Sequence, residues 1–82
     1  MPLEDLKHMA KVIGTKQVKK AITKNQVKRV YIASDAEPHI IGPIREACKE
    51  NLIDYEMVES MEELGHACGI DVGSATVAIL ND

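Results

Sequence analysis

The stretch VKRVYIASDAEP, residues 27–38, decides the fold of this chain. Its first part, Val27–Ala33, is dense in β-branched residues, and Ser34 and Asp35 end the run with residues that favour turns. An apolar run of this length without strict polar alternation is typical of a strand whose centre is buried on both faces. We therefore predict a central strand over residues 27–33 and an exit loop over residues 35–38.

Before this strand the sequence predicts one helix and a very short extended piece. Leu3, Leu6 and Ala10 recur at helical spacing, and they predict a first helix that ends at about Lys11. Residues 12–13 then form the extended piece, because the glycine that follows them breaks any regular element.

A second helix is predicted from about Lys16 to Lys24, because Gly14 and Thr15 supply a break and a cap before it. Its apolar residues fall on one face of the helix and should be buried. They are Val18, Ala21 and Ile22.

Downstream of the central strand, helices and strands keep alternating. Gly42 and Pro43 disturb the helical pattern that follows Pro38, so we expect a kinked or late-starting helix there. Ser60 and Glu63 form a capping box, which marks the start of a short helix. The predicted elements are a helix from after Pro38 to near Asn51, a strand over residues 55–58, a short helix that stops at Gly69, and a strand over residues 75–80.

This alternation predicts an α/β sandwich around three main strands plus the short piece at residues 12–13. A length of 82 residues leaves room for a single domain over residues 1–82. No apolar run reaches the roughly 20 residues of a membrane span, and the first residues lack the order of a secretory signal. We expect a cytoplasmic protein that does not contact a membrane.

The formal net charge of −3 hides a strong segregation of charge along the chain. Residues 7–29 contain eight basic residues and no acidic residue, whereas residues 30–82 contain eleven acidic residues and only Arg45 and Lys49 as bases. A local positive field of this kind attracts a polyanion even when the whole molecule is acidic. The alternative is a solvated lysine face without a partner.

The second predicted helix concentrates this charge. Lys16, Lys20 and Lys24 follow one another at every fourth residue, and like charges at that spacing cost about 0.2–0.5 kcal/mol per pair. Lys16 also lies in the first turn, where the helix dipole disfavours a cation. An anionic partner would remove both penalties. Gln17, between the lysines, has an amide that can pair with a base edge, although an exposed helix former is the simpler interpretation.

The sequence offers no aromatic platform on which single-stranded bases could stack. It contains no Phe and no Trp, and Tyr31 and Tyr55 both fall on predicted strands. If the polyanion is a nucleic acid, we therefore expect a folded, double-stranded or kinked RNA that is recognised by its shape and backbone, and not DNA.

Other chemistry finds little support in the residues. Cys48 and Cys68 are too few for a disulfide scaffold and wrongly spaced for zinc, so we expect two reduced core residues and no metal site. Asp35 and Glu37 are an acidic pair that could serve acid–base chemistry or cap the next helix. No third group points to a reaction, so we predict neither catalytic residues nor a cofactor. An enzyme acting on a phosphorylated substrate would need a reactive constellation that the sequence lacks.

Four stretches taken together resemble the kink-turn RNA-binding family of ribosomal proteins, the L7Ae group, and above all its small bacterial members. They are residues 13–20, residues 32–38, residues 64–69 and residues 75–79. The resemblance implies a three-layer α/β/α sandwich with a small mixed sheet of about four strands. It also implies binding to the kink-turn, a sharply bent RNA motif with tandem sheared G·A pairs.

In this family a Gly-x-Asn-Glu-x-x-Lys run at the start of the second helix enters the major groove at the G·A pairs. Gly14 and Lys20 match that run, whereas Lys16 stands for Asn and Gln17 stands for Glu. Gln17 keeps a carbonyl acceptor but has no charge, and Lys16 can donate to guanine but cannot accept. Thr15 and Lys19 complete the RNA-binding residues that the resemblance implies on this helix.

The resemblance implies further RNA contacts in two loops. Glu37 matches an acidic residue of the family, Ile41 matches an apolar contact after it, and Met61 stands where relatives often carry a lysine. Four residues match the loop that covers an extruded nucleotide: Ile70, Asp71, Val72 and Gly73.

The chain is then expected to be a monomer that binds kink-turns in ribosomal or regulatory RNA, in some cases on the ribosome, and is not an enzyme. The alternative is a protein-interaction module of the same fold whose basic helix faces an acidic protein partner.

Overall fold

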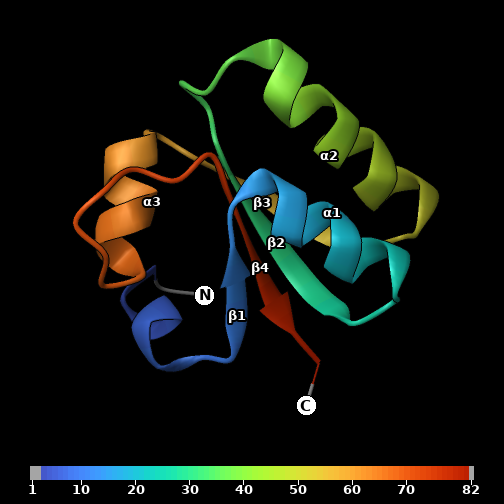
Figure 1. Cartoon of the computed structure of the whole chain (residues 1–82), viewed down its shortest axis with the longest axis horizontal. Coiled ribbons are helices and arrows are strands. Elements are labelled where there is room, and N and C mark those ends of the chain that lie inside the picture. Colours follow the sequence, from blue (N-terminus) through green and yellow to red (C-terminus); the bar gives the residue numbers. More distant parts are fainter. Residues whose placement is uncertain (1–2, 82) are drawn as a thin grey trace.

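The computed structural model describes the backbone of residues 3–81 and the side chains of residues 6–81 (Figure 1). Short helices and strands alternate along the chain, as the sequence predicts. In chain order they are the 3-10 helix η1 (Leu3–His8), β1 (Lys11–Ile13), α1 (Thr15–Thr23), β2 (Val27–Ala33), α2 (Pro38–Glu50), β3 (Asp54–Val58), α3 (Met61–Ala67) and β4 (Thr76–Leu80).

The four strands form one mixed sheet in the order β1-β4-β2-β3. β4 runs antiparallel to β1 and β2, whereas β2 and β3 are parallel, so β1, β2 and β3 all point the same way. Helices α1 and α2 cover one face of the sheet, and α3 and η1 cover the other (Figure 1). The predicted α/β fold with three layers is confirmed.

The central strand β2 has the bounds that the sequence predicts, and its second half is closed on both faces. Val30, Tyr31, Ile32 and Ala33 are all buried. Each lies between β4 on one side and β3 on the other, as in the pairing of Tyr31 with Val77 and with Glu56. Apolar side chains at consecutive positions therefore pack against helices on both faces.

The first predicted helix is too long. The structure holds a 3-10 helix that ends at His8, and Lys11 already belongs to β1, opposite Ile79 of β4. The backbone of Ala10 is engaged as well, because its carbonyl accepts a hydrogen bond from Leu80 N at 3.0 Å. Pairing with a strand some seventy positions along the chain overrides the local helical pattern.

For the next helix the sequence predicts either a kink or a late start, and the late start is wrong, since α2 begins at Pro38. Proline is favoured at the first helical position, where no N–H is needed. Glu37 O accepts from Ile40 N at 2.9 Å and from Ile41 N at 3.2 Å, which closes the first turn. Pro43 lies inside α2 and withholds only the bond that an N–H there would donate to the carbonyl of His39.

Candidate functional site

The loops that contain the predicted site residues lie together at one end of the sheet. Because β1, β2 and β3 are parallel in direction, their ends meet at the same edge, and each is followed there by a helix. Gly14 N donates to Thr76 O at 3.0 Å, and Ala33 N donates to Ala75 O at 2.8 Å. The start of α1, the exit of β2 and the entry to β4 are thus joined at one rim by backbone hydrogen bonds.

Helix α1 exposes its polar residues at this rim. Its buried residues are the three that the sequence predicts, namely Val18, Ala21 and Ile22. Gly14 has a φ of 101°, a left-handed conformation that favours glycine, and this bend turns the chain from β1 into the helix. The predicted contact residues on the outer side are exposed: Lys16, Gln17, Lys19 and Lys20, with Thr15 half-buried.

No acidic side chain that the structure describes pairs with the start of α1. The helix has no acidic residue in its first turn, and Gly14 provides no side-chain cap. Among the described side chains, the one ion pair within 4.0 Å joins His39 to Glu37 and involves no lysine. The free N–H groups of the first turn and the neighbouring ammonium groups therefore share one positive surface.

The predicted residues of α1 divide between two sides of the helix. Lys16 and Lys19 line a groove against α2, whereas Gln17 and Lys20 line a shallow pocket of about 200 Å³ on the side of β1. Val12, Lys24 and Gln26 complete that pocket. Gln17 thus lies between ammonium groups next to the free edge of the sheet, where an elongated ligand can reach it.

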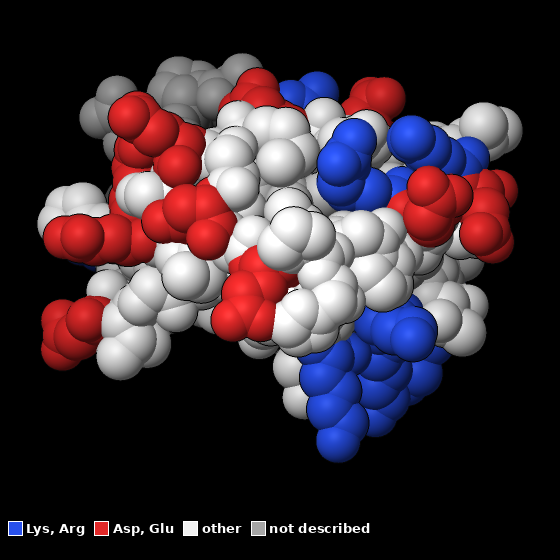
Figure 2. Space-filling view, turned by 90° about the horizontal axis from the view of Figure 1, so that it is seen from above, with Lys and Arg blue, Asp and Glu red and all other residues white. Residues whose placement is uncertain are grey.

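Charge is separated in space as it is along the chain (Figure 2). Figure 2 shows one dense patch of Lys and Arg side chains at the lower right, further Lys and Arg side chains mixed with Asp and Glu at the upper right, and several Asp and Glu side chains on the left. Helix α1 exposes Lys16, Lys19 and Lys20. Helix α3 carries Glu62 and Glu63 in its first turn. A polyanion approaching this end of the molecule is attracted to α1 and repelled from α3.

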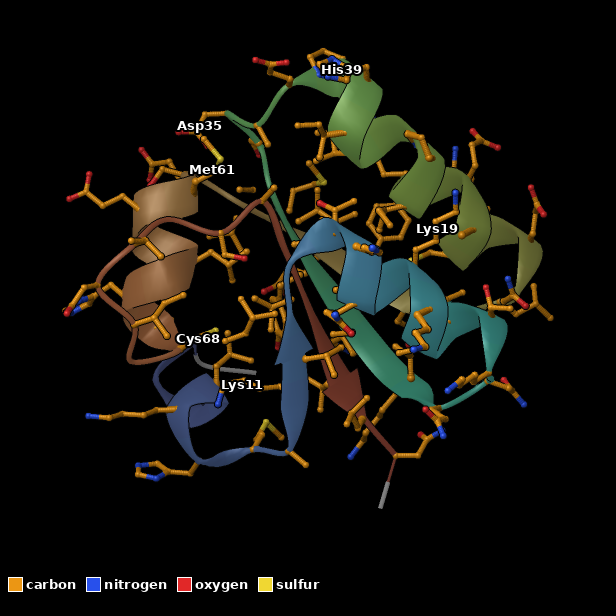
Figure 3. The ribbon with its side chains drawn as sticks, viewed as in Figure 1. Lys11, Lys19, Asp35, His39, Met61 and Cys68 are labelled. Atoms are coloured by element: carbon orange, nitrogen blue, oxygen red, sulfur yellow. The ribbon has the colours of Figure 1, made fainter. Side chains whose placement is uncertain are left out.

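Asp35 has a structural role that the sequence did not predict. Its Oδ1 accepts a hydrogen bond of 2.8 Å from Met61 N, so it caps α3 and not the next helix, α2 (Figure 3). Glu37 occupies the N-cap position of α2 without a side-chain cap bond. Its carboxylate instead lies 3.2 Å from Nδ1 of His39, with both side chains largely exposed. Glu37 therefore remains available at the rim, whereas Asp35 is engaged.

The backbone of the loop before β4 is hydrogen-bonded to α3, whereas the tip of the loop is exposed to solvent. Ile70 N donates to Gly65 O at 3.1 Å, and Ser74 N donates to Met61 O at 3.0 Å. A Cβ at Gly65 would overlap the carbonyl oxygen of Val72, so the loop packs directly on α3. Asp71, Val72 and Gly73 are exposed, Val72 by 70%, and Ile70 is half-buried. The predicted contact loop is thus rigidly placed with an apolar tip.

A hollow of about 520 Å³ lies between this loop and the outer face of α3. Glu62, Glu63 and Asp71 make its lining acidic, and Ser60, His66, Ile70, Val72 and Gly73 complete it. The exposed tip of the loop at Val72 therefore borders an acidic surface of α3.

Ile41 does not offer the surface that the sequence analysis expects. It is 7% exposed and packs in the core with Ile44 and Cys48, which follow it on the same helix face. The half-buried neighbour Ile40 reaches the surface instead and lines the groove against α1. The spacing of Ile41, Ile44 and Cys48 was the signal in the sequence that could have separated the core residue from the surface residue.

The remaining reactive side chains are structural. Cys48 and Cys68 are buried and unpaired, and burial raises the pKa of both thiols, although Lys11 near Cys68 lowers that thiol's pKa in part (Figure 3). Tyr31 is fully buried and Tyr55 is half-buried, so neither provides an open ring face. Within the described residues, no three His, Cys, Asp or Glu side chains are grouped as metal ligands, and no helix is long and apolar enough to cross a membrane.

Known proteins resemble this chain in sequence over most of its length. A sequence model of the ribosomal protein L7Ae/L30e/S12e/Gadd45 family matches residues 4–82. "RNA-binding protein TTE2299" of Caldanaerobacter subterraneus is 50% identical over 68 residues, 83% of each chain. "RNA-binding protein YbxF" of Geobacillus stearothermophilus is 44% identical over 69 residues, 84% of each chain.

Solved structures share the fold. The "15.5kD RNA binding protein" of Giardia lamblia superposes with a TM-score of 0.91 at 27% identity, over 98% of this chain and 71% of that one. A protein of unknown function from Bacillus halodurans superposes with a TM-score of 0.88 at 25% identity, over 96% and 83% of the two chains.

Proposed function

This chain belongs to the ribosomal protein L7Ae/L30e/S12e/Gadd45 family, and from that premise we propose that it is an RNA-binding protein that recognises kink-turns. The family and the relatives are named as RNA-binding proteins and not as enzymes, which supports the broader statement. The narrower statement, that the RNA is a kink-turn, depends on the geometry of α1 and the loops around its start.

One observation carries the proposal: the exposed start of α1 holds Gln17 between lysines that form no ion pair with any acidic side chain among residues 6–81. The major groove of regular A-form RNA is too deep and narrow for an α-helix, so α1 suits an RNA whose groove is opened by a sharp bend. Gln17 would then accept from a guanine amino group at a G·A pair, while Lys16 and Lys20 reach guanine acceptors or phosphates.

The two loops at the rim support the same orientation of the RNA. Glu37 is exposed at the exit of β2, and Val72 is exposed at the tip of the loop before β4. An apolar tip and a carboxylate acceptor are suited to one extruded base, which is turned out of the stack at the bend. Met61 is half-buried at the start of α3, so the backbone contact that a lysine makes in relatives is not available here.

The mechanism is a population shift. The protein contacts both the G·A step and the extruded base only when the RNA is bent, so the binding energy offsets the cost of bending. This role needs no cofactor, and it suits ribosomal or regulatory RNA that must hold a bend.

A gel-shift experiment tests the proposal with two RNAs of equal length. The first contains a standard kink-turn, and in the second Watson–Crick pairs replace the tandem G·A pairs. We expect tight binding to the first and binding at least about tenfold weaker to the second, since each mismatched base contact costs about 1–3 kcal/mol. Equal affinity for the two RNAs would reduce the function to general RNA binding, and no affinity for either would remove it.

A further inference from the structure

A groove of about 500 Å³ runs between α1 and α2, beside the surface to which the proposed function assigns the kink-turn. Two helices supply its walls, and their side chains come from segments at least twenty positions apart in the sequence. It is lined by Thr15, Lys16 and Lys19 of α1 and by His39, Ile40, Pro43 and Ile44 of α2. In Figure 3, Lys19 and His39 mark these two walls.

The floor and the rim of the groove differ in chemistry. Ile40, Pro43 and the fully buried Ile44 give an apolar floor. Lys16 and Lys19 are exposed and place two ammonium groups on the α1 wall. No carboxylate lines the groove, because Glu37 lies beyond His39 and pairs with its Nδ1.

We propose that this groove binds one unpaired nucleobase of the RNA, in addition to the kink-turn contacts, and the proposal rests on the proposed function above. A nucleotide combines a flat apolar face with an anionic phosphate a few ångströms away, which matches an apolar floor beside two cations. The base lies against Ile40 and Pro43, and its phosphates face Lys16 and Lys19. The exposed imidazole of His39 closes one end and can stack on the base.

The position of the groove supports a nucleotide over an acidic protein segment. The lysines on its wall belong to the same helix as Gln17 and Lys20, which face the other side of α1. An RNA bound over α1 can therefore contact both sides of the helix. A nucleotide next to the bend of that same RNA can reach the groove, so no separate protein partner is needed.

The direct test uses nuclear magnetic resonance on the whole protein with two small probes. Adenosine 5′-monophosphate carries a base, whereas ribose 5-phosphate has the same sugar and phosphate without one. We expect the nucleotide to shift the backbone signals of Thr15, Lys19 and Ile40, and to bind about tenfold more tightly than the sugar phosphate. Equal shifts by both probes would show a phosphate site only and would overturn the proposal.

Two variants with the same added charge make the test specific. Pro43→Glu puts a carboxylate into the groove at an exposed position, and glutamate is well tolerated inside a helix. Asn51→Glu puts the same charge at the exposed C-terminal end of α2, eight positions later. Nucleotide affinity should fall about tenfold in the first variant and stay unchanged in the second. A loss in both variants, or in neither, would contradict a base-binding groove.

The outcome separates this inference from the proposed function. Suppose that the wild-type protein does not bind the nucleotide in the groove, and that Pro43→Glu still discriminates fully between kink-turn and Watson–Crick RNA. Then only the groove assignment is wrong. If discrimination is absent in the wild-type protein, the proposed function is wrong. Shifts in the groove caused by a polyglutamate peptide and not by the nucleotide would assign the groove to a protein partner.

Discussion

Helices α1 and α3 start at the same end of the sheet, yet their first turns are opposite in chemistry. At α3, Ser60 Oγ accepts from Glu63 N at 3.0 Å, Asp35 Oδ1 accepts from Met61 N at 2.8 Å, and two glutamates complement the dipole. At α1 there is no side-chain cap, no acid and a lysine in the first turn. The protein satisfies the start of α3 with its own side chains, whereas the first-turn N–H groups of α1 have no described side-chain acceptor and could take an anionic ligand.

The difference matters because a capped helix contributes stability to the free protein, whereas an uncapped cationic helix contributes affinity. A Ser or Asp cap is worth about 0.5–2 kcal/mol, and repulsion between neighbouring lysines on α1 costs about 0.2–0.5 kcal/mol per pair. Substitutions at the two starts should therefore affect different measurements.

The largest effect is expected at Gln17. Gln17→Ala removes the acceptor for a guanine amino group. It should reduce the difference in binding free energy between kink-turn and Watson–Crick RNA by about 1–3 kcal/mol. Gln17→Glu restores the residue that the family resemblance implies at this position and should retain the selectivity, and Glu63→Ala on α3 should leave it unchanged. The measurement is a pair of gel-shift titrations for each variant. If Gln17→Ala lowers both affinities equally, or neither, Gln17 does not contact a base.

The Ser60 cap of α3 should contribute to the stability of the protein and not to its RNA affinity. Ser60→Ala removes the acceptor for Glu63 N, and it should lower the free energy of unfolding by about 1 kcal/mol. Denaturation by urea measures this change. Ser34→Ala is the matched control, since Ser34 is exposed and its hydroxyl makes no hydrogen bond among the described residues. A loss of RNA affinity at unchanged stability would place Ser60 in the binding surface and break the contrast between the helices.

Contacts between lysines and RNA phosphates should make the RNA-binding constant K depend on the salt concentration. With about three to five phosphates neutralised, log K should fall against log salt with a slope on the order of −2 to −4. Lys20→Ala should reduce the size of that slope by about one, whereas Lys49→Ala, at the exposed end of α2, should not change it. Affinity titrations at several salt concentrations measure both. Lost affinity at an unchanged slope would place Lys20 on a base.

The smallest effect is expected in the free protein. Lys20→Ala relieves two repulsive pairs, with Lys16 and with Lys24, so at low salt the free energy of unfolding should rise by about 0.4–1 kcal/mol. Added salt should shrink the gain, because the charges are exposed. Urea denaturation without RNA measures it. A loss of stability in this variant would mean that the lysines of α1 already have a partner inside the protein.

The sequence predicted what local patterns determine. The bounds of β2 and the buried face of α1 follow from residue spacing, and the capping box at Ser60 is a contact over three residues. The start of α2 at Pro38 and the burial of Ile41 were readable from local pattern, whereas other failures depend on distant partners. Asp35 caps a helix 26 positions away, and the short η1 ends because Lys11 pairs with β4. The groove beside Ile40 arises from packing of α1 on α2, which no pattern within either helix contains.

The strand order has a consequence for the synthesis of the protein. β4 lies between β1 and β2, and among the described strands it is the only partner of β1. The turn that starts α1 is also fixed from this strand, by the bond from Gly14 N to Thr76 O. The N-terminal part of a chain leaves the ribosome first. The segment that contains α1 therefore emerges before residues 76–80 are available to pair with β1 and β2. The surface proposed for kink-turn recognition should therefore be incomplete in a nascent chain until its last strand is in place.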